Sequence, residues 1–93
     1  MKAILFKPGD RPKVIQIENT LKALQEAVGG YIEAVTLFSN ACLICNEEGM
    51  LMNLEMQEIL GRKFFGSCLL VGTKGEEFTD IPPGMKSLFG AKE

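Results

Sequence analysis

The chain lacks the side chains on which most enzyme chemistry depends. Its 93 residues include no histidine and no tryptophan, and none of its few serines lies in a Gly-x-Ser-x-Gly sequence. Histidine is the commonest general base near neutral pH, and it usually activates a nucleophilic serine or cysteine. We therefore predict a protein that is not an enzyme and has no catalytic residues.

Long apolar runs and blocks of like charge are also missing. No stretch approaches the roughly 20 apolar residues that a membrane-spanning helix needs, and the apolar start at 3–6 is shorter than the core of a signal peptide. The formal net charge is −2, whereas duplex nucleic acid requires a concentrated basic face. We predict an intracellular protein with no membrane and no duplex nucleic acid among its partners.

Cysteine is scarce, and the odd number of three fits a reducing compartment better than a set of disulfides. Cys42 and Cys45 match the C-x-x-C pattern. They fall in an apolar segment that predicts a strand, where residues three apart point to opposite faces. With Cys68 as the only other soft ligand, a four-ligand zinc site is not available within one protomer. We predict core cysteines, no metal site and no cofactor.

A capped helix followed at once by a strand is the clearest local signal. Asn19 or Thr20 can cap a helix over 20–28, and Gly29 and Gly30 can end it in a sharp reversal. The whole chain, 1–93, is predicted to be one α+β domain. Its mostly antiparallel sheet has about five to six strands in the order β-β-α-β-β-β-α-β, with two helices packed on one face.

The remaining elements follow from apolar patterning and turn residues. We predict a first hairpin between strands 2–7 and 13–18, joined by a turn that contains Pro8 and Gly9. Further strands are predicted over 31–38, 42–45, 50–52 and the apolar run 64–71, with a short edge strand at 76–78. A second helix is predicted over 54–60. Residues 85–93 form either a short helix or a mobile tail.

Basic and aromatic side chains near turns are the candidate binding groups. Lys7, Arg11 and Lys13 lie around the first turn. Arg62 begins a second basic pair, and such groups supply charge-assisted donors to phosphate. Tyr31 follows the glycine reversal, where its ring could stack on a base. The alternatives are a solvated hairpin end and a half-buried strand tyrosine. Glutamates such as Glu47 could instead bind a divalent metal in an enzyme, which we consider the least favoured hypothesis.

Two segments resemble a known family, the domain of unknown function 3846 that is common in bacteriophages and mobile elements. The first is IENTLKALQEAVGGYIE at 17–33 and the second is CNEEG at 45–49, with a looser similarity at 70–72 and 75–78. The family's usual Leu-Pro-x-Asn-Arg segment is replaced here by 53–58, which has neither the proline nor the arginine. The resemblance implies a small phage-type accessory protein in a bacterial cytoplasm, and no agreed activity.

These features together give the functional prediction. We expect a non-enzymatic, counter-defence binding protein that sequesters a small anionic, nucleotide-like ligand, and we expect it to be a homo-oligomer. Six residues are assigned to the ligand: Arg11, Lys13 and Arg62 to its phosphates, Tyr31 to stacking, and Glu33 and Asn46 to hydrogen bonds with a base or ribose. The alternative is a protein-interaction module that inhibits or adapts a host protein through a sheet edge or its methionines.

Overall fold

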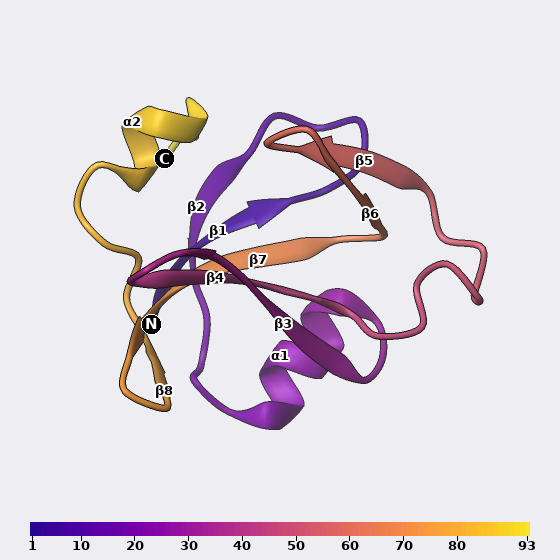
Figure 1. The fold of residues 1–93 in the computed structure, drawn as a ribbon, viewed down its shortest axis with the longest axis horizontal. Helices are drawn as coiled ribbons and strands as arrows, with labels where there is room; N and C mark the ends of the chain where they lie inside the picture. The colour runs from indigo at the N-terminus through magenta and orange to yellow at the C-terminus, as the bar shows by residue number, and fades with distance from the viewer.

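The protein is an α+β domain, as predicted, and the computed structural model describes all 93 residues. The elements are β1 (Lys2–Phe6), β2 (Lys13–Gln16), α1 (Leu21–Val28), β3 (Ile32–Phe38), β4 (Ala41–Asn46), β5 (Met56–Ile59), β6 (Arg62–Phe65), β7 (Cys68–Lys74), β8 (Glu77–Thr79) and α2 (Met85–Phe89). Six strands form the main antiparallel sheet, and β5 and β6 form a separate hairpin (Figure 1). No helix has the length and apolar character needed to cross a membrane.

The main sheet is built around β7. Its order is β2-β1-β7-β4-β3, and β8 also pairs with β7. The predicted first hairpin is confirmed, with Ala3 opposite Ile15 in the β1–β2 register. On its other side β1 meets the first half of β7, where Phe6 lies opposite Cys68. The apolar strands β4 and β7 are therefore central, and the more polar β2 and β3 are the edges.

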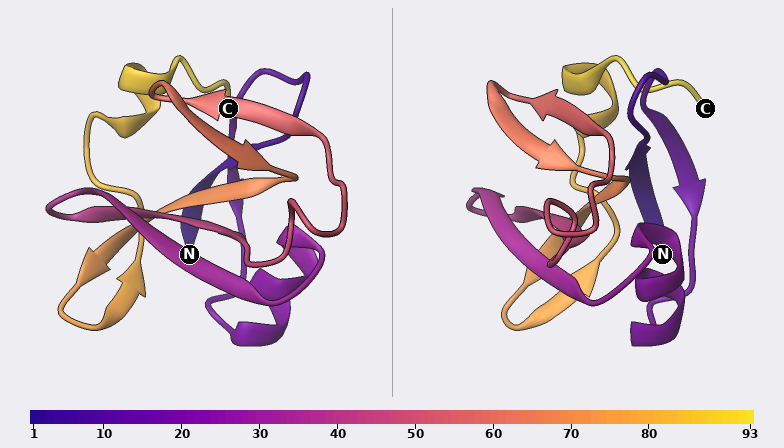
Figure 2. Two further views of the ribbon diagram at one scale, coloured as in Figure 1. Left: turned by 45° about the vertical axis from the view of Figure 1, so that its right-hand side comes forward. Right: turned by 90° about the vertical axis from the view of Figure 1, so that its right-hand side faces the viewer.

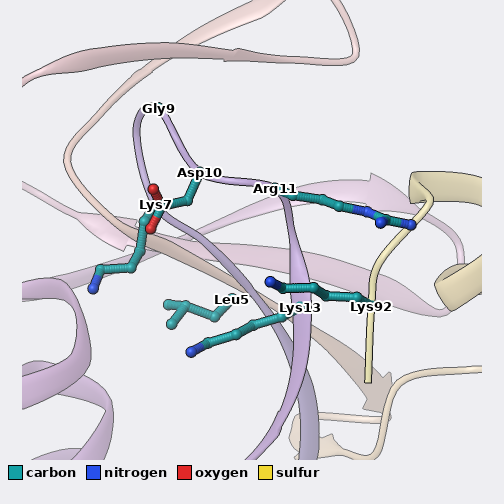
Figure 3. Close-up of a pocket in the computed structure, with 7 residues that line it drawn as sticks. All are labelled: Leu5, Lys7, Gly9, Asp10, Arg11, Lys13 and Lys92. Atoms are coloured by element: carbon teal, nitrogen blue, oxygen red, sulfur yellow. The ribbon is translucent and has the colours of Figure 1, made fainter.

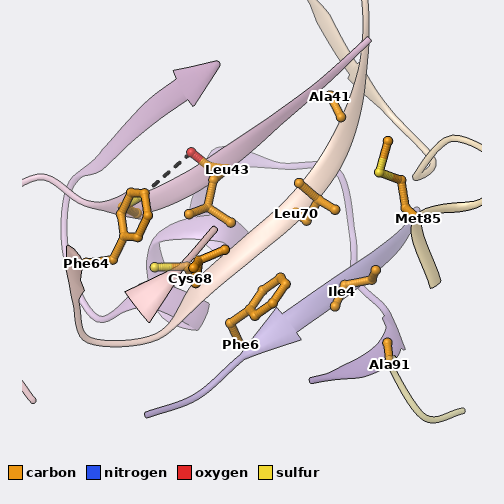
Figure 4. Close-up of a cluster of buried hydrophobic side chains, with 11 residues drawn as sticks. Ile4, Phe6, Ala41, Leu43, Phe64, Cys68, Leu70, Met85 and Ala91 are labelled. Carbon is orange, nitrogen blue, oxygen red and sulfur yellow. Dashed lines mark hydrogen bonds between the residues drawn. The ribbon is translucent and has the colours of Figure 1, made fainter. Parts of the chain in front are cut away.

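Alternation along the central strands gives the sheet two apolar faces. Leu43 and Cys45 of β4 belong to one buried cluster, whereas Cys42 and Ile44 belong to the other. Figure 4 shows the first cluster, in which Leu43, Leu70, Phe6 and Phe64 converge. Because side chains alternate with a period of two, each central strand contributes to both cores.

Helix α1 covers the second face, and its boundaries follow from its caps. The Thr20 Oγ1 accepts a hydrogen bond from the Ala23 N–H at 3.2 Å, so Thr20 rather than Asn19 is the N-cap. Gly29 ends the helix in the left-handed conformation, with φ of 82°. Leu24 and Val28 are buried against the sheet. The predicted helix over 20–28 is thus confirmed to within a residue.

The predicted helix at 54–60 is wrong, because this segment forms strand β5 and turns back into β6. Ile59 pairs with Arg62 across two residues, Leu60 and Gly61, whose φ angles of 51° and 75° are both positive. Two-residue hairpin turns of type I′ require positive φ at both central positions. Ile59 is buried and Glu58 exposed, so the segment follows the period of a strand.

Two neighbouring strand predictions also need correction. The predicted strand at 50–52 is a series of turns in which the Met52 N–H donates to the Glu48 carbonyl at 2.8 Å. The predicted single strand at 64–71 is divided into β6 and β7 at Gly66, whose φ is 89°. Its missing side chain leaves room for Leu54, which a Cβ atom at this position would overlap. A residue with a side chain is disfavoured there on both grounds.

The two helices lie on opposite faces of the sheet rather than on one face. Met85 and Phe89 of α2 pack in the first cluster, to which the β5–β6 hairpin also contributes, whereas α1 packs in the second (Figure 2). The ring centroids of Phe6 and Phe89 are 5.2 Å apart in an edge-to-face arrangement. Residues 85–93 therefore contain a short helix that contributes to the core. The prediction placed a helix at 54–60 on the α1 face, and the hairpin formed there covers the other face instead.

Candidate anion-binding pocket

A basic pocket lies at the turn between β1 and β2. It has a volume of about 330 Å³. The lining residues are Leu5, Lys7, Gly9, Asp10, Arg11, Lys13 and Lys92 (Figure 3). Leu5 is the only apolar side chain among them, and four of the seven residues carry positive charge. The lining is thus far more basic than the chain as a whole, whose formal net charge is −2.

Two distant segments of the chain build this pocket. The Asp10 N–H donates to the Lys7 carbonyl at 3.0 Å, which closes the turn after β1. The C-terminal segment then lies beside β2. The Lys92 N–H donates to the Pro12 carbonyl at 3.0 Å, and the Lys92 carbonyl accepts from the Val14 N–H at 2.7 Å. These backbone bonds hold Lys92 next to Lys13.

The positive charges of the pocket are not neutralised by neighbouring carboxylates. Asp10 is the one acidic residue in the lining. The only ion pair in the structure joins Lys86 Nζ to Glu93 Oε1 at 3.1 Å, and none of the pocket cations takes part in it. Clustered cations with one acidic neighbour create a positive potential that attracts anions.

Arg11 and Lys13, both predicted as ligand residues, line this pocket together. Their side chains nevertheless point in different directions. Figure 3 shows Arg11 extended toward the C-terminal segment, where its Nε donates to the Gly90 carbonyl at 3.0 Å. The ammonium groups of Lys13 and Lys92 lie on the same side as Leu5. Lysines therefore present most of the free charge, and Arg11 holds the C-terminal segment in place.

Two lining residues, Lys7 and Lys92, are not among the six assigned to the ligand from the sequence. Lys7 belongs to the basic group around the Pro-Gly turn that contains Arg11 and Lys13. Lys92 is separated from Lys13 by most of the chain, and no local pattern indicates that these two residues form a bridge.

The other four predicted residues lie elsewhere. Glu33 and Asn46 line a second pocket of about 220 Å³ between β3, β4 and β6, and Lys63 rather than Arg62 supplies its positive charge. Arg62 lies 5.8 Å from the centroid of the Phe64 ring, within the range of a cation–π contact. Tyr31 is 66% exposed and lines neither pocket. The six residues therefore do not form one site.

Asn46 is buried, and its side chain is occupied by protein partners. Its Nδ2 donates to the Val28 carbonyl at 3.1 Å and contacts the Met52 sulfur at 3.5 Å. Its Oδ1 accepts from the Glu48 N–H at 2.8 Å. Gly30 allows this approach, because a Cβ atom there would lie 2.9 Å from Nδ2. Asn46 thus joins the end of α1 to the turn after β4.

All three cysteines are buried free thiols. Cys42 and Cys45 belong to clusters on opposite faces of the sheet, as the strand period predicted. Burial, with a smaller effect of Cys45, raises the pKa of Cys42 above its usual value of about 9. A hydrogen bond to Cys68, together with burial, raises the pKa of Cys45. No group of three or more His, Cys, Asp or Glu residues is placed to hold a metal ion.

Fold and pocket together define a class: a small α+β protein with a basic surface pocket at a hairpin turn. More particularly, the chain belongs to the family described as a domain of unknown function (DUF3846), whose family model matches residues 1–91. This membership confirms the resemblance seen in the sequence. No curated protein and no solved structure matches the chain.

Proposed function

We propose that the protein binds a small phosphate-bearing ligand in the pocket at the β1–β2 turn, without catalysing a reaction. The observation that carries the proposal is the group of four cations, Lys7, Arg11, Lys13 and Lys92, around one pocket with no ion pair among them. Holding like charges together is unfavourable, and a bound anion relieves that repulsion. The volume of about 330 Å³ falls at the lower end of the range for small-molecule sites.

The chemistry of the lining supports a ligand that is mainly a polyanion. Lys7, Lys13 and Lys92 have exposed side chains that can turn toward different phosphate oxygens. Leu5 at the floor offers a small apolar surface for a sugar or base edge. Because lysine is a flexible point charge, the site favours charge over exact shape. A nucleotide with two or more phosphates satisfies these requirements.

In a phage or mobile-element setting, such a protein would act in the bacterial cytoplasm by sequestration. Holding a nucleotide signal lowers its free concentration, which requires a tight site and abundant protein but no catalytic group. The absence of histidine in the chain is compatible with this role. Counter-defence against a nucleotide-dependent host system is the activity that we propose for it.

Isothermal titration calorimetry can test the proposal with inorganic pyrophosphate and a panel of cyclic dinucleotides as probes. We expect binding that weakens as salt is raised, because exposed charges are screened. Lys13→Ala should weaken it at least several-fold. Lys74→Ala, a matched control at the distant β7–β8 turn, should leave it unchanged. Absence of heat with every probe, or an equal effect of both variants, would exclude this pocket as the site.

An exposed apolar segment favours a second candidate function, a protein-interaction module. Met50, Leu51 and Met52 follow one another in the turns after β4, and Leu51 is 85% exposed. Methionine-rich exposed surfaces are typical of adaptable protein contacts. A stoichiometric partner captured from a bacterial lysate by the native protein, and lost with Leu51→Ser, would support this function. Equal capture by the native protein and the variant would contradict it.

A further inference from the structure

Two buried thiols face each other across neighbouring strands of the sheet. In the β4–β7 ladder, Leu43 pairs with Leu70 and Ile44 pairs with Leu69. The ladder ends at this second pair, and continuing its antiparallel register by one step brings Cys45 opposite Cys68. Both residues belong to the same buried cluster, and each thiol shifts the pKa of the other. Cys42 is excluded from this pair, because it points to the other face of the sheet.

The backbone spacing of such a pair suits a disulfide. Directly opposed residues in an antiparallel ladder have Cα atoms about 4.5 to 5.5 Å apart. Disulfides join residues whose Cα atoms lie about 4.4 to 6.8 Å apart. The strands β4 and β7 are hydrogen-bonded neighbours, and their ladder reaches the residues next to both cysteines. Cys45 and Cys68 can therefore form a disulfide, whereas Cys42 and Cys45 cannot, because they lie on opposite faces of the sheet.

A small oxidant has a route to one of the two sulfurs. Cys45 lines the second pocket, together with Glu33 and Asn46, whereas Cys68 has no exposed surface. This pocket of about 220 Å³ has room for a molecule the size of hydrogen peroxide but leads to no other cysteine. Each thiol otherwise makes only a long contact to a backbone carbonyl, Cys45 to Leu43 at 3.6 Å and Cys68 to Gly66 at 3.8 Å.

We propose that Cys45 and Cys68 are a redox-active pair that a peroxide converts into a reversible intrachain disulfide. Two thiols and one hydrogen peroxide give one disulfide and two waters. Two S–H bonds and the O–O bond break, and one S–S bond and two O–H bonds form. The two thiol protons end in the two waters, and the two electrons lost by the sulfurs reduce the two peroxide oxygens. A dithiol reductant reverses the change by exchange. The bridge joins β4 to β7 beside the second pocket.

The bridge has a predictable effect on the folded protein. It closes a loop of more than 20 residues that contains the β5–β6 hairpin, which restricts the unfolded chain. Because the strands are already in register, little strain should offset this gain. We expect oxidation to raise Tm by about 10 °C or more, given the usual relation between stability and Tm for a domain of this size.

The test is oxidation of the full chain by hydrogen peroxide, followed by intact mass, peptide mapping and thiol counting. We expect a loss of two hydrogen masses, a Cys45–Cys68 cross-linked peptide and one remaining thiol. Dithiothreitol should reverse all three changes. Cys42→Ala, the matched control, should still form the bridge, and Cys68→Ala should not. Three free thiols after oxidation, a bridge to Cys42 or a disulfide between two chains would each overturn the proposal. Because the disulfide is detected in the native protein itself, a variant that fails to fold does not affect the test.

Discussion

Replacing Asn46 with alanine tests whether this residue serves the fold or a ligand. The change removes hydrogen bonds to the Val28 carbonyl at 3.1 Å and from the Glu48 N–H at 2.8 Å. Val28 is buried, and its carbonyl lies at the end of α1, where no later residue of the helix can donate to it. A buried acceptor left without a partner costs about 1 to 3 kcal/mol.

The two losses can be summed to estimate the effect. The bond to Glu48 is partly buried at a turn, and such a hydrogen bond contributes about 1 kcal/mol. We therefore expect Asn46→Ala to lower the free energy of unfolding by about 2 to 4 kcal/mol, out of a total of about 5 to 14 kcal/mol for a chain of this length. Tm should fall by about 10 to 25 °C.

Urea denaturation followed by circular dichroism measures this loss, with two variants for comparison. Asn19→Ala removes a similar amide bond, to the Phe78 carbonyl at 2.9 Å, at an exposed site, and should cost about 1 kcal/mol or less. Asn46→Asp keeps an acceptor for Glu48 but sets a carboxylate against the Val28 carbonyl. Its deficit should be smaller at pH 4 than at pH 7, because a protonated carboxyl group can donate.

A change below about 0.5 kcal/mol in Asn46→Ala would refute this reasoning, since surface substitutions without a structural role fall in that range. If such a variant kept its stability but lost ligand binding, the ligand role predicted from the sequence would be supported instead. Loss of stability without loss of ligand affinity in the remaining folded protein would assign Asn46 to the fold.

Three further predictions concern packing, capping and pH. Gly49→Ala should lower the free energy of unfolding, measured in urea, by about 3 kcal/mol, because the new Cβ atom overlaps the Phe65 carbonyl. Gly9 has positive φ but no neighbouring atom within reach of a Cβ, so Gly9→Ala should lower it by about 1 to 2 kcal/mol. Equal losses would show that the contact is not the cause. Thr20→Ala should cost about 1 kcal/mol through the lost cap, and Thr20→Ser should restore most of it. The pKa of the Cys42 thiol is raised on folding, so this thiol stays protonated in the folded state at a pH where the unfolded chain releases its proton. The free energy of unfolding should therefore fall as pH rises above about 9. Cys42→Ala should reduce that slope, by up to about 1.4 kcal/mol per pH unit, and an unchanged slope would contradict it.

The sequence predicted the elements that local chemistry determines. Thr20 and Gly29 bound α1 through caps that act within one turn of the helix. The opposite faces of Cys42 and Cys45 follow from the period of a strand alone. In contrast, 54–60 is too short for its apolar spacing to separate helix from strand, and its Leu60-Gly61 turn lacks the usual Asn-Gly or Asp-Gly signal.

The candidate site was harder to predict, because its parts meet only through tertiary structure. Arg11 and Lys13 could be grouped, since they flank one turn. Lys92 reaches them only when the C-terminal segment pairs with β2. The sequence predicts a ligand role for Asn46, a polar residue at a turn, whereas its bond to Val28 joins the two segments that carry the family resemblance.

The pairing of Lys92 with β2 also bears on how copies of the sheet can join. Lys92 occupies backbone groups of Pro12 and Val14 at one edge, whereas β3 at the other edge has β4 as its single neighbour. Exposed backbone N–H and C=O groups of an edge strand can pair with another chain, so Lys92 reduces the edge that β2 offers to a second copy. Removal of residues 90–93 would expose these groups of β2. The last residues of the chain therefore protect part of one sheet edge from pairing with another chain.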